Sequence, residues 1–256
     1  MTQSRLPPAQ AEAPRRLRRA EAVLARRTQR ILLVLERCWD SHNHQAALRT
    51  ADAFGVQHVW TVEPELSARR LSNNVTKGAW RWLSLKQFHS TPDLIAALRA
   101  DRRTIWATDL SRGAEELRTE ACIVPARLAI VIGREADGVS AEMLAAADRR
   151  VYLPMQGFTG SFNLSVATAL TLQRLFDACP EARGDLPESE KAALRELWYR
   201  RLAKSEETWA EYQAWLEAPP PPLPELRPED AFRQARVPAK IRRRNAHELD
   251  EDPQET

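Results

Sequence analysis

The chain has 256 residues and a formal net charge of +3, and this length and near-neutral balance favour one domain with appended segments over two equal domains. Its three cysteines, Cys38, Cys122 and Cys179, lie far apart, which indicates a reducing compartment and argues against a thiolate metal site. Without a signal peptide or an apolar run long enough to cross a bilayer, the sequence predicts a cytoplasmic protein that does not contact membranes.

The charge is concentrated near the two ends of the chain. Residues 1–37 contain nine Arg and three Glu, a net charge of +6, and residues 227–244 contain seven Lys or Arg and two acids before an acidic end at 248–255. Two basic segments around a nearly neutral middle suggest a polyanionic partner, of which nucleic acid is the commonest. Solvated tails are the alternative, and charge alone does not separate the two.

The hydrophobic pattern predicts strands that alternate with helices. After a disordered start at 1–14, residues 15–30 form a basic amphipathic helix, and a buried strand at 31–35 precedes a helix at 43–53 that Gly55 ends. The later elements, in chain order, are a strand at 58–62, an extended segment at 80–82, a helix at 91–100, strands at 104–108 and 127–132, a helix at 137–147, a strand at 151–153 and a helix that begins at Ser161. This alternation predicts an α/β domain with a mostly parallel sheet, whose ligands bind at the carboxyl ends of the strands.

The stretch at 151–172 combines features of a ligand site. A short apolar strand stops at Pro154, a loop with two glycines follows, and polar side chains such as Ser161 and Asn163 stand where an apolar helix begins. Free backbone N–H groups at a helix start suit an anionic or polar ligand, and glycines let the backbone approach it closely. The alternative is that Ser161 is an ordinary N-cap on a core helix.

A second stretch follows the strand at 127–132 directly. Its Gly133-x-Glu135-x-x-Gly138 pattern allows a sharp turn and presents one carboxylate at the sheet edge. It has neither the lysine of a phosphate-binding loop nor the glycine spacing of a dinucleotide site. For Glu135 the alternative is an acid placed to interact with the dipole of the next helix.

A third stretch places Asn43 at a helix start and Arg49 six residues on, among small residues. A guanidinium on a packed helix needs an anion or a water-filled cleft, because burying it unpaired is costly. The alternative partner is Asp52, which lies three residues further along the same helix.

Taken together, the three stretches resemble the SPOUT superfamily of methyltransferases, and within it the SpoU/TrmH branch of RNA ribose 2′-O-methyltransferases. The order and the spacing of the motifs agree with that family over roughly residues 20–180. The matching residues are Asn43, Arg49-Thr50 and Phe54-Gly55 in the first motif, Gly133, Glu135 and Gly138 in the second, and Pro154-Met155, Ser161, Asn163 and Ser165-Val166-Ala167 in the third.

The resemblance implies an α/β domain with a deep trefoil knot near its carboxyl end, an exception to the rule against knotted chains. It also implies S-adenosylmethionine as cofactor, a homodimer whose interface completes the site, and no metal, because the leaving group is a neutral thioether. The cofactor-binding residues implied are Thr108, Gly133, Leu153, Met155 and Phe162.

In the implied reaction, a ribose 2′-hydroxyl attacks the methyl group of a sulfonium. The family resemblance gives Arg49 the central role, with Asn43, Glu135, Ser161 and Asn163 orienting it, the ribose and the cofactor. Because a free arginine stays protonated at neutral pH, we expect Arg49 to position a phosphate and the developing alkoxide electrostatically rather than to act as the base.

Within the branch, the basic N-terminal helix looks like that of the tRNA enzymes that methylate the D-loop guanosine at position 18. Its RNA-binding residues are then Arg15, Arg16, Arg18, Arg19 and Arg26, which bind phosphates with little sequence information. Ribosomal RNA, another tRNA position, or a role as a non-catalytic RNA-binding assembly factor are the alternatives.

The resemblance also suggests how the chain divides. The predicted segments are a basic arm and helix at 1–30, the SPOUT domain at 31–180, a helical extension at 181–217 and a Pro-rich, charged, disordered tail at 218–256. The extension is expected to pack through Leu194, Leu197, Trp198 and Leu202.

Overall fold

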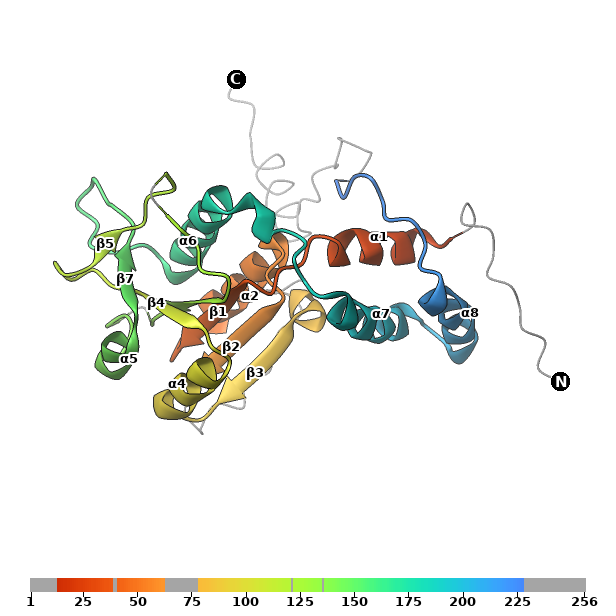
Figure 1. Cartoon of the computed structure of the whole chain (residues 1–256), viewed down its shortest axis with the longest axis horizontal. Coiled ribbons are helices and arrows are strands. Elements are labelled where there is room, and N and C mark those ends of the chain that lie inside the picture. Colours follow the sequence, from red (N-terminus) through yellow and green to blue (C-terminus); the bar gives the residue numbers. More distant parts are fainter. Residues whose placement is uncertain (1–12, 39–40, 63–77, 121, 135, 228–256) are drawn as a thin grey trace, which may run out of the picture. The chain divides into compact units, whose positions relative to one another are not determined.

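The computed structural model describes residues 13–38, 41–62, 78–120, 122–134 and 136–227. The contacts divide the chain after Leu223 into a large unit, which holds the helices and strands of the described residues, and a short C-terminal unit. The large unit contains a seven-stranded parallel sheet in the order β3-β2-β1-β6-β4-β7-β5 with helices on both faces (Figure 1). The predicted α/β class is therefore confirmed, whereas the trefoil knot depends on how the chain threads and stays a prediction.

The element bounds follow the predicted alternation closely. The strands are β1 (Ile31–Glu36), β2 (His58–Val62), β3 (Ser84–Phe88), β4 (Thr104–Thr108), β5 (Glu115–Glu116), β6 (Leu128–Ile132) and β7 (Arg149–Tyr152). The helices are α1 (Arg15–Leu24), α2 (Ser41–Phe54), α4 (Thr91–Ala100), α5 (Ala141–Ala146), α6 (Leu164–Ala178), α7 (Glu188–Leu202) and α8 (Glu206–Glu217), with 3-10 turns η2 (Ala79–Trp82) and η3 (Pro180–Ala182). In the part of the chain that is described, no helix has the length and apolar character needed to cross a bilayer.

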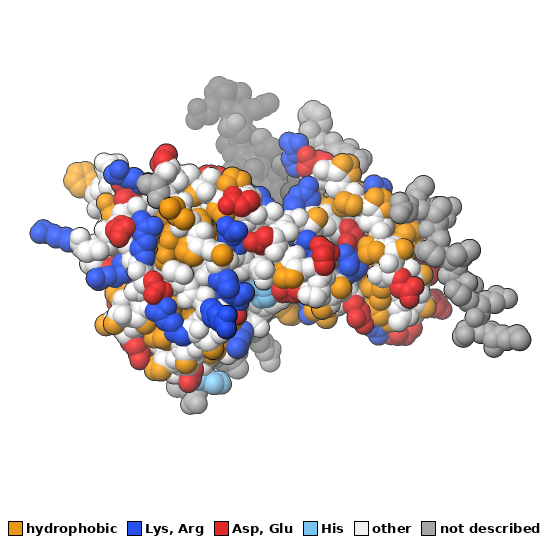
Figure 2. All heavy atoms as spheres, in the orientation of Figure 1, with side chains coloured by type: hydrophobic (Ala, Val, Ile, Leu, Met, Phe, Trp, Pro, Cys, Tyr) orange, Lys and Arg blue, Asp and Glu red, His pale blue; other side chains and the backbone are white. Residues whose placement is uncertain are grey.

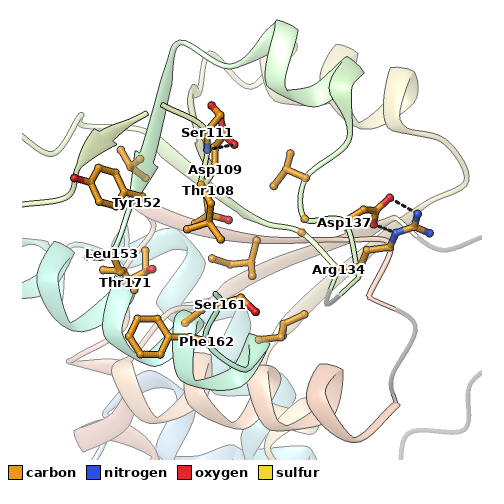
Figure 3. Close-up of a pocket in the computed structure, with 18 of the residues that line it drawn as sticks. Thr108, Asp109, Ser111, Arg134, Asp137, Tyr152, Leu153, Ser161, Phe162 and Thr171 are labelled. Atoms are coloured by element: carbon orange, nitrogen blue, oxygen red, sulfur yellow. Dashed lines mark hydrogen bonds and ion pairs between the residues drawn. The ribbon is translucent and has the colours of Figure 1, made fainter. Parts of the chain in front are cut away.

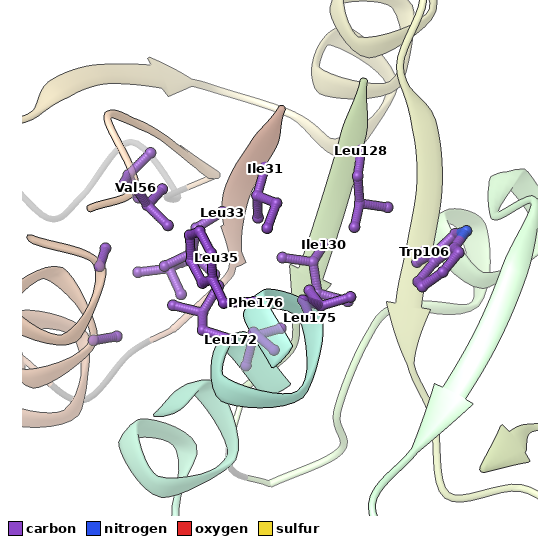
Figure 4. Close-up of a cluster of buried hydrophobic side chains, with 14 of the residues drawn as sticks. Ile31, Leu33, Leu35, Val56, Trp106, Leu128, Ile130, Leu172, Leu175 and Phe176 are labelled. Atoms are coloured by element: carbon purple, nitrogen blue, oxygen red, sulfur yellow. The ribbon is translucent and has the colours of Figure 1, made fainter. Parts of the chain in front are cut away.

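The interior strand β1 explains why the core has two layers. All six of its residues are buried. Ile31, Leu33 and Leu35 join the cluster formed with α2 and α6, which Figure 4 shows, while Leu32 and Val34 join the cluster formed with α4 and α5. A strand covered on both faces requires such a continuous apolar run, and the alternation of side chains divides it between the two layers.

Three helices form a separate cluster outside the sheet. Leu17 and Leu24 of α1 pack with residues of α7 and α8, including Trp198 and Trp215. Leu194 and Trp198 are buried as predicted, but Leu197 is 43% exposed, so its place in the packing face was wrong. The buried face of α7 is thus narrower than the leucine pattern suggested.

The sequence prediction was wrong where local chemistry competed with periodicity. Trp80 and Trp82 lie in the 3-10 turn η2 rather than in an extended segment, and Trp82 packs edge-on against Trp198 with ring centroids 5.7 Å apart. Strand β3, which the sequence prediction missed, follows at the edge of the sheet.

Some helices also begin at other residues than the sequence predicted. Helix α5 begins only after Ser140, whose hydroxyl accepts a hydrogen bond from the Met143 N–H at 3.2 Å. Helix α6 begins at Leu164 rather than at Ser161, because Asn163 is the N-cap and accepts from the Ser165 N–H at 3.0 Å. Gly55 does end α2, with a positive φ of 85° that favours glycine.

Candidate functional site

A cavity of about 330 Å³ lies at the carboxyl ends of β4, β6 and β7, beside the start of α6 (Figure 3). Its volume is in the range of small-molecule sites, and its place is the edge where a parallel sheet binds ligands. The wall contains all five residues predicted to hold a cofactor and one predicted catalytic residue: Thr108, Gly133, Leu153, Met155, Phe162 and Ser161.

The loop after β6 forms one side of this cavity. A Cβ atom at Gly133 would collide with the backbone of Gly138 and Val139, so only glycine lets the loop fold back on itself. Arg134 and Gly138 exchange backbone hydrogen bonds of 3.0 and 3.1 Å, and the Arg134 guanidinium pairs with Asp137. Glu135, the predicted carboxylate of this loop, lies outside the described residues.

Asp109 gives the wall a negative charge that the sequence prediction missed. Partial burial acts to raise the pKa of its carboxyl group, but the hydrogen bonds that Ser111 donates and the nearby charge of Arg150 outweigh burial and lower that pKa. The carboxylate therefore stays ionised at neutral pH. Because Asp109 directly follows Thr108 at the end of β4, the strand-end rule that selected Thr108 could have found it.

Two predicted catalytic residues from distant parts of the chain meet at the start of α6. The Asn163 side-chain amide donates a hydrogen bond to Asn43 Oδ1 at 2.9 Å. Asn163 Oδ1 is occupied by the Ser165 N–H and hydroxyl, which fixes the orientation of its amide group. This hydrogen bond joins the starts of α2 and α6. Asn163 directly follows Ser161 and Phe162, which line the cavity.

Arg49 lies on α2 but is not part of the cavity wall. Its side chain is exposed, and among the described residues it has no hydrogen-bond or ion-pair partner. The alternative partner Asp52 instead binds Arg27, with 2.5 Å between Arg27 Nη2 and Asp52 Oδ1.

The arginines in α1 and in the segment that follows it differ in their contacts and exposure. Arg16 donates to the Leu202 carbonyl at 3.3 Å, and Arg26 donates to the Ala22 carbonyl at 2.6 Å. Arg18 is half-buried, whereas Arg15, Arg16, Arg19 and Arg26 are exposed. On the face shown in Figure 2, Lys and Arg side chains are interspersed with acidic ones. These arginines therefore differ in their exposure and in the contacts that they make within the chain.

The described ranges contain no group of three or more His, Cys, Asp or Glu side chains placed to hold a metal ion.

Comparison with known proteins identifies the family. Residues 30–173, more than half of the chain, match the SpoU rRNA Methylase family. The chain belongs to the SpoU/TrmH family of SPOUT methyltransferases. It is therefore an RNA 2′-O-methyltransferase of the SpoU type.

Several similar proteins have curated names or solved structures. A tRNA (guanosine(18)-2′-O)-methyltransferase of Borreliella burgdorferi is 35% identical over 189 residues, which cover 73% of this chain and 85% of that protein. A 23S rRNA (guanosine-2′-O-)-methyltransferase of Neisseria meningitidis is 34% identical over 145 residues, or 56% of each protein. The crystal structure of the A. aeolicus TrmH/SpoU tRNA modifying enzyme aligns with a TM-score of 0.66 at 27% identity, covering 74% of this chain and 98% of that one.

The cofactor of this family is S-adenosylmethionine, and the cavity suits it. Its wall offers apolar side chains such as Leu153 for a purine, the Asp109 carboxylate for a cationic group, and the tight glycine loop after β6. When bound, this cofactor supplies a methyl group on a positively charged sulfur.

Proposed function

We propose that this chain methylates the ribose 2′-hydroxyl of guanosine 18 in the D-loop of tRNA. The observation that carries the proposal is the extent of the matches. The alignment with the tRNA enzyme of B. burgdorferi spans 189 residues, more than the 144 residues of the family domain, so it reaches into the helices outside the sheet. The ribosomal RNA enzyme of N. meningitidis aligns over 145 residues, about the domain alone.

The A. aeolicus structure supports the same choice. That tRNA-modifying enzyme is covered over 98% of its length, so nearly all of its chain has a counterpart in this one. We infer that α1, α7 and α8 belong to the RNA-binding equipment of the enzyme, with the exposed arginines Arg15, Arg16, Arg19 and Arg26 contacting phosphates.

For the chemistry, we propose that the hydrogen-bonded pair of Asn43 and Asn163 orients the ribose at the cavity. Ser161, in the cavity wall, is placed to bind the same sugar, and Glu135 keeps its predicted orienting role. Arg49 holds the 3′ or 5′ phosphate and stabilises the negative charge that develops on the 2′-oxygen. The proton of the hydroxyl leaves toward solvent or a phosphate oxygen.

We also propose that the active form is a homodimer. Val166 and Leu170 are four residues apart on α6 and are 44% and 39% exposed, and Phe162 beside them is 38% exposed. Such an apolar stripe at helical spacing suits an isologous contact with a second copy. The contact would lie next to the cavity and would complete the site with residues of the second copy.

The first experiment is methyl transfer from labelled S-adenosylmethionine to an unmodified tRNA transcript, with ribosomal RNA in a parallel reaction. We expect 2′-O-methylguanosine at position 18 of the tRNA. Label in ribosomal RNA alone would show that ribosomal RNA, and not tRNA, is the substrate. Label at another tRNA nucleotide would show that the methylated position is not guanosine 18. Cofactor binding without transfer to any cellular RNA would favour the non-catalytic assembly factor.

Arg49 is tested by substitution. Because Arg49 is exposed and has no partner among the described residues, Arg49→Ala is expected to fold and bind the cofactor normally while kcat falls by about 100-fold or more. Arg49→Lys keeps the charge and loses the planar fork, so it is expected to retain an intermediate kcat. A loss of folding in Arg49→Ala would show a structural role instead.

A further inference from the structure

The hydroxyl of Thr171 is the feature of the cavity that the family motifs do not explain. Thr171 lies on α6, its side chain is 1% exposed, and it lines the cavity beside Leu153 (Figure 3). Its Oγ1 atom is buried and has no hydrogen-bond partner among the residues that the structure describes. An unpaired buried hydroxyl lowers stability, so a group that binds in the cavity is the natural partner for it.

A second threonine on the same helix shows that this arrangement is not forced by the helix. Thr168 is also fully buried, but its hydroxyl donates to the Leu164 carbonyl four residues back, at 2.8 Å. On α2, Thr50 donates to the Ala46 carbonyl in the same way, at 3.0 Å. Thr168 and Thr50 thus bind the backbone carbonyl one turn back, whereas Thr171, which lines the cavity, does not.

The surroundings of Thr171 indicate which part of the cofactor it meets. The wall includes the apolar side chains of Leu117, Val151 and Leu153, whereas the charged side chains of Asp109 and Arg134 occupy other parts of it. A purine has apolar faces and a polar edge, while the amino-acid end of the cofactor is charged. A hydroxyl can donate to a ring nitrogen or accept from an exocyclic amino group.

We propose that Thr171 is a positioning residue that hydrogen-bonds the adenine edge of S-adenosylmethionine and so contributes to cofactor specificity. The proposal rests on the cofactor of the family and is independent of which RNA is methylated. Its test therefore uses binding without RNA.

The test compares Thr171→Val with the matched Thr168→Val in the full-length protein. Calorimetric titration with S-adenosylhomocysteine is expected to give a Kd for Thr171→Val that is raised roughly fivefold, as for one neutral hydrogen bond. Thermal unfolding without ligand is expected to show an unchanged or higher midpoint for this variant, because an unpaired hydroxyl has been removed. Thr168→Val is expected to bind with the wild-type Kd.

Two further measurements separate the alternatives. Thr171→Ser keeps the hydroxyl and is expected to keep the wild-type Kd. S-inosylhomocysteine differs from S-adenosylhomocysteine only at the purine edge, so the preference of the wild type for adenine is expected to shrink in Thr171→Val. An unchanged Kd for S-adenosylhomocysteine would overturn the proposal, and an equal loss for both ligands would overturn the contact with adenine. If the wild-type protein binds neither ligand, the assignment of S-adenosylmethionine as its cofactor would be wrong.

Discussion

Glu36, at the carboxyl end of β1, is a buried acidic residue that links β1 to the starts of α4 and α5. Glu36 is only 1% exposed to solvent. Oε1 accepts hydrogen bonds from the hydroxyls of Thr91 at 2.8 Å and Ser140 at 2.6 Å, and Oε2 accepts from the Ser140 N–H at 2.9 Å. Thr91 and Ser140 stand at the starts of α4 and α5, where helix dipoles favour a negative charge. Ser140 also ends the loop that begins at Gly133.

Replacing this carboxylate is expected to loosen that loop. Glu36→Leu leaves the Ser140 N–H without an acceptor, and we expect the free energy of unfolding to fall by about 3 kcal/mol. The Kd for S-adenosylmethionine is expected to rise with it. Glu36→Gln can satisfy the same groups after two hydroxyls turn, so it is expected to lose about 1 kcal/mol. Urea unfolding and calorimetry measure both. The control is Glu142→Leu on the exposed face of α5, and an equal loss there would contradict the assignment.

The sequence alone located most of the cavity wall but not its whole chemistry. Thr108 and Gly133 stand directly at strand ends, so the parallel-sheet rule and the motifs led to the right edge. Asp109 follows the same rule and was missed, while Thr171 lies in an apolar helical run that reads as core. Its unpaired hydroxyl is a property of three-dimensional packing, which no local pattern encodes. The same holds for Glu36, whose partners are 55 and 104 residues away.

Among the elements, α1 and α7 are held together by a buried polar contact as well as by apolar packing. The Glu21 carboxylate, 7% exposed, accepts two hydrogen bonds of 2.8 Å from Arg195 and one of 2.8 Å from the Tyr199 hydroxyl. Burial, and then the charge of Glu21, raise the pKa of Tyr199, so its hydroxyl remains a donor throughout the neutral range. This contact fixes the register of the two helices.

Removing the cation of this contact is expected to be costly. Arg195→Ala leaves a nearly buried carboxylate without its positive partner, and we expect the free energy of unfolding to fall by about 3 kcal/mol. The control lies on the same helix. Arg200 pairs with Glu206 in solvent, with side chains 48% and 80% exposed, so Arg200→Ala is expected to change stability far less than Arg195→Ala. Chemical denaturation of both variants measures the difference, and equal losses would show that burial of the Glu21 pair adds nothing.

At the scale of elements, β2, β4 and α4 were predicted with the observed bounds, whereas the helix predicted over 15–30 ends at Leu24 and the starts of α5 and α6 moved. Strand β1 and helix α4 were found because their apolar patterns are unambiguous. Strand β3 was missed because it is an edge strand with three exposed residues in succession, and Trp82 misled because it packs on α7 rather than on the sheet. The start of α6 moved by three residues because Asn163 competes successfully with Ser161 as the cap.

At the scale of the large unit, the segment after α1 connects the three outer helices to the sheet. Arg27 has no solvent exposure, donates to the Asp52 carboxylate at 2.5 Å and to the Val56 carbonyl at 3.2 Å, and lies 5.3 Å from the ring centroid of Trp198. It therefore contacts the end of α2, the start of β2 and α7 together. Burial lowers the pKa of Arg27, and the charge of Asp52 opposes that effect. Helix α2 also carries Asn43 and Arg49, so this contact links the helices that we propose bind RNA to the proposed catalytic residues.

This link predicts a defect in RNA use that spares cofactor binding. Arg27→Met leaves Asp52 unpaired, and we expect unfolding to become easier by about 3 kcal/mol and kcat/KM for tRNA to fall. The Kd for S-adenosylmethionine is expected to stay at the wild-type value, because the cavity lies at the opposite ends of the strands. Asp52→Leu and the double variant complete a cycle. If the pair acts as a unit, the double variant is more stable than the sum of the single losses implies, since an apolar pair replaces the ionic one. Restored stability of the double variant with kcat/KM still low would show that the charge itself sets the position of α2. A wild-type kcat/KM in Arg27→Met would instead show that the outer helices bind RNA independently of this connection.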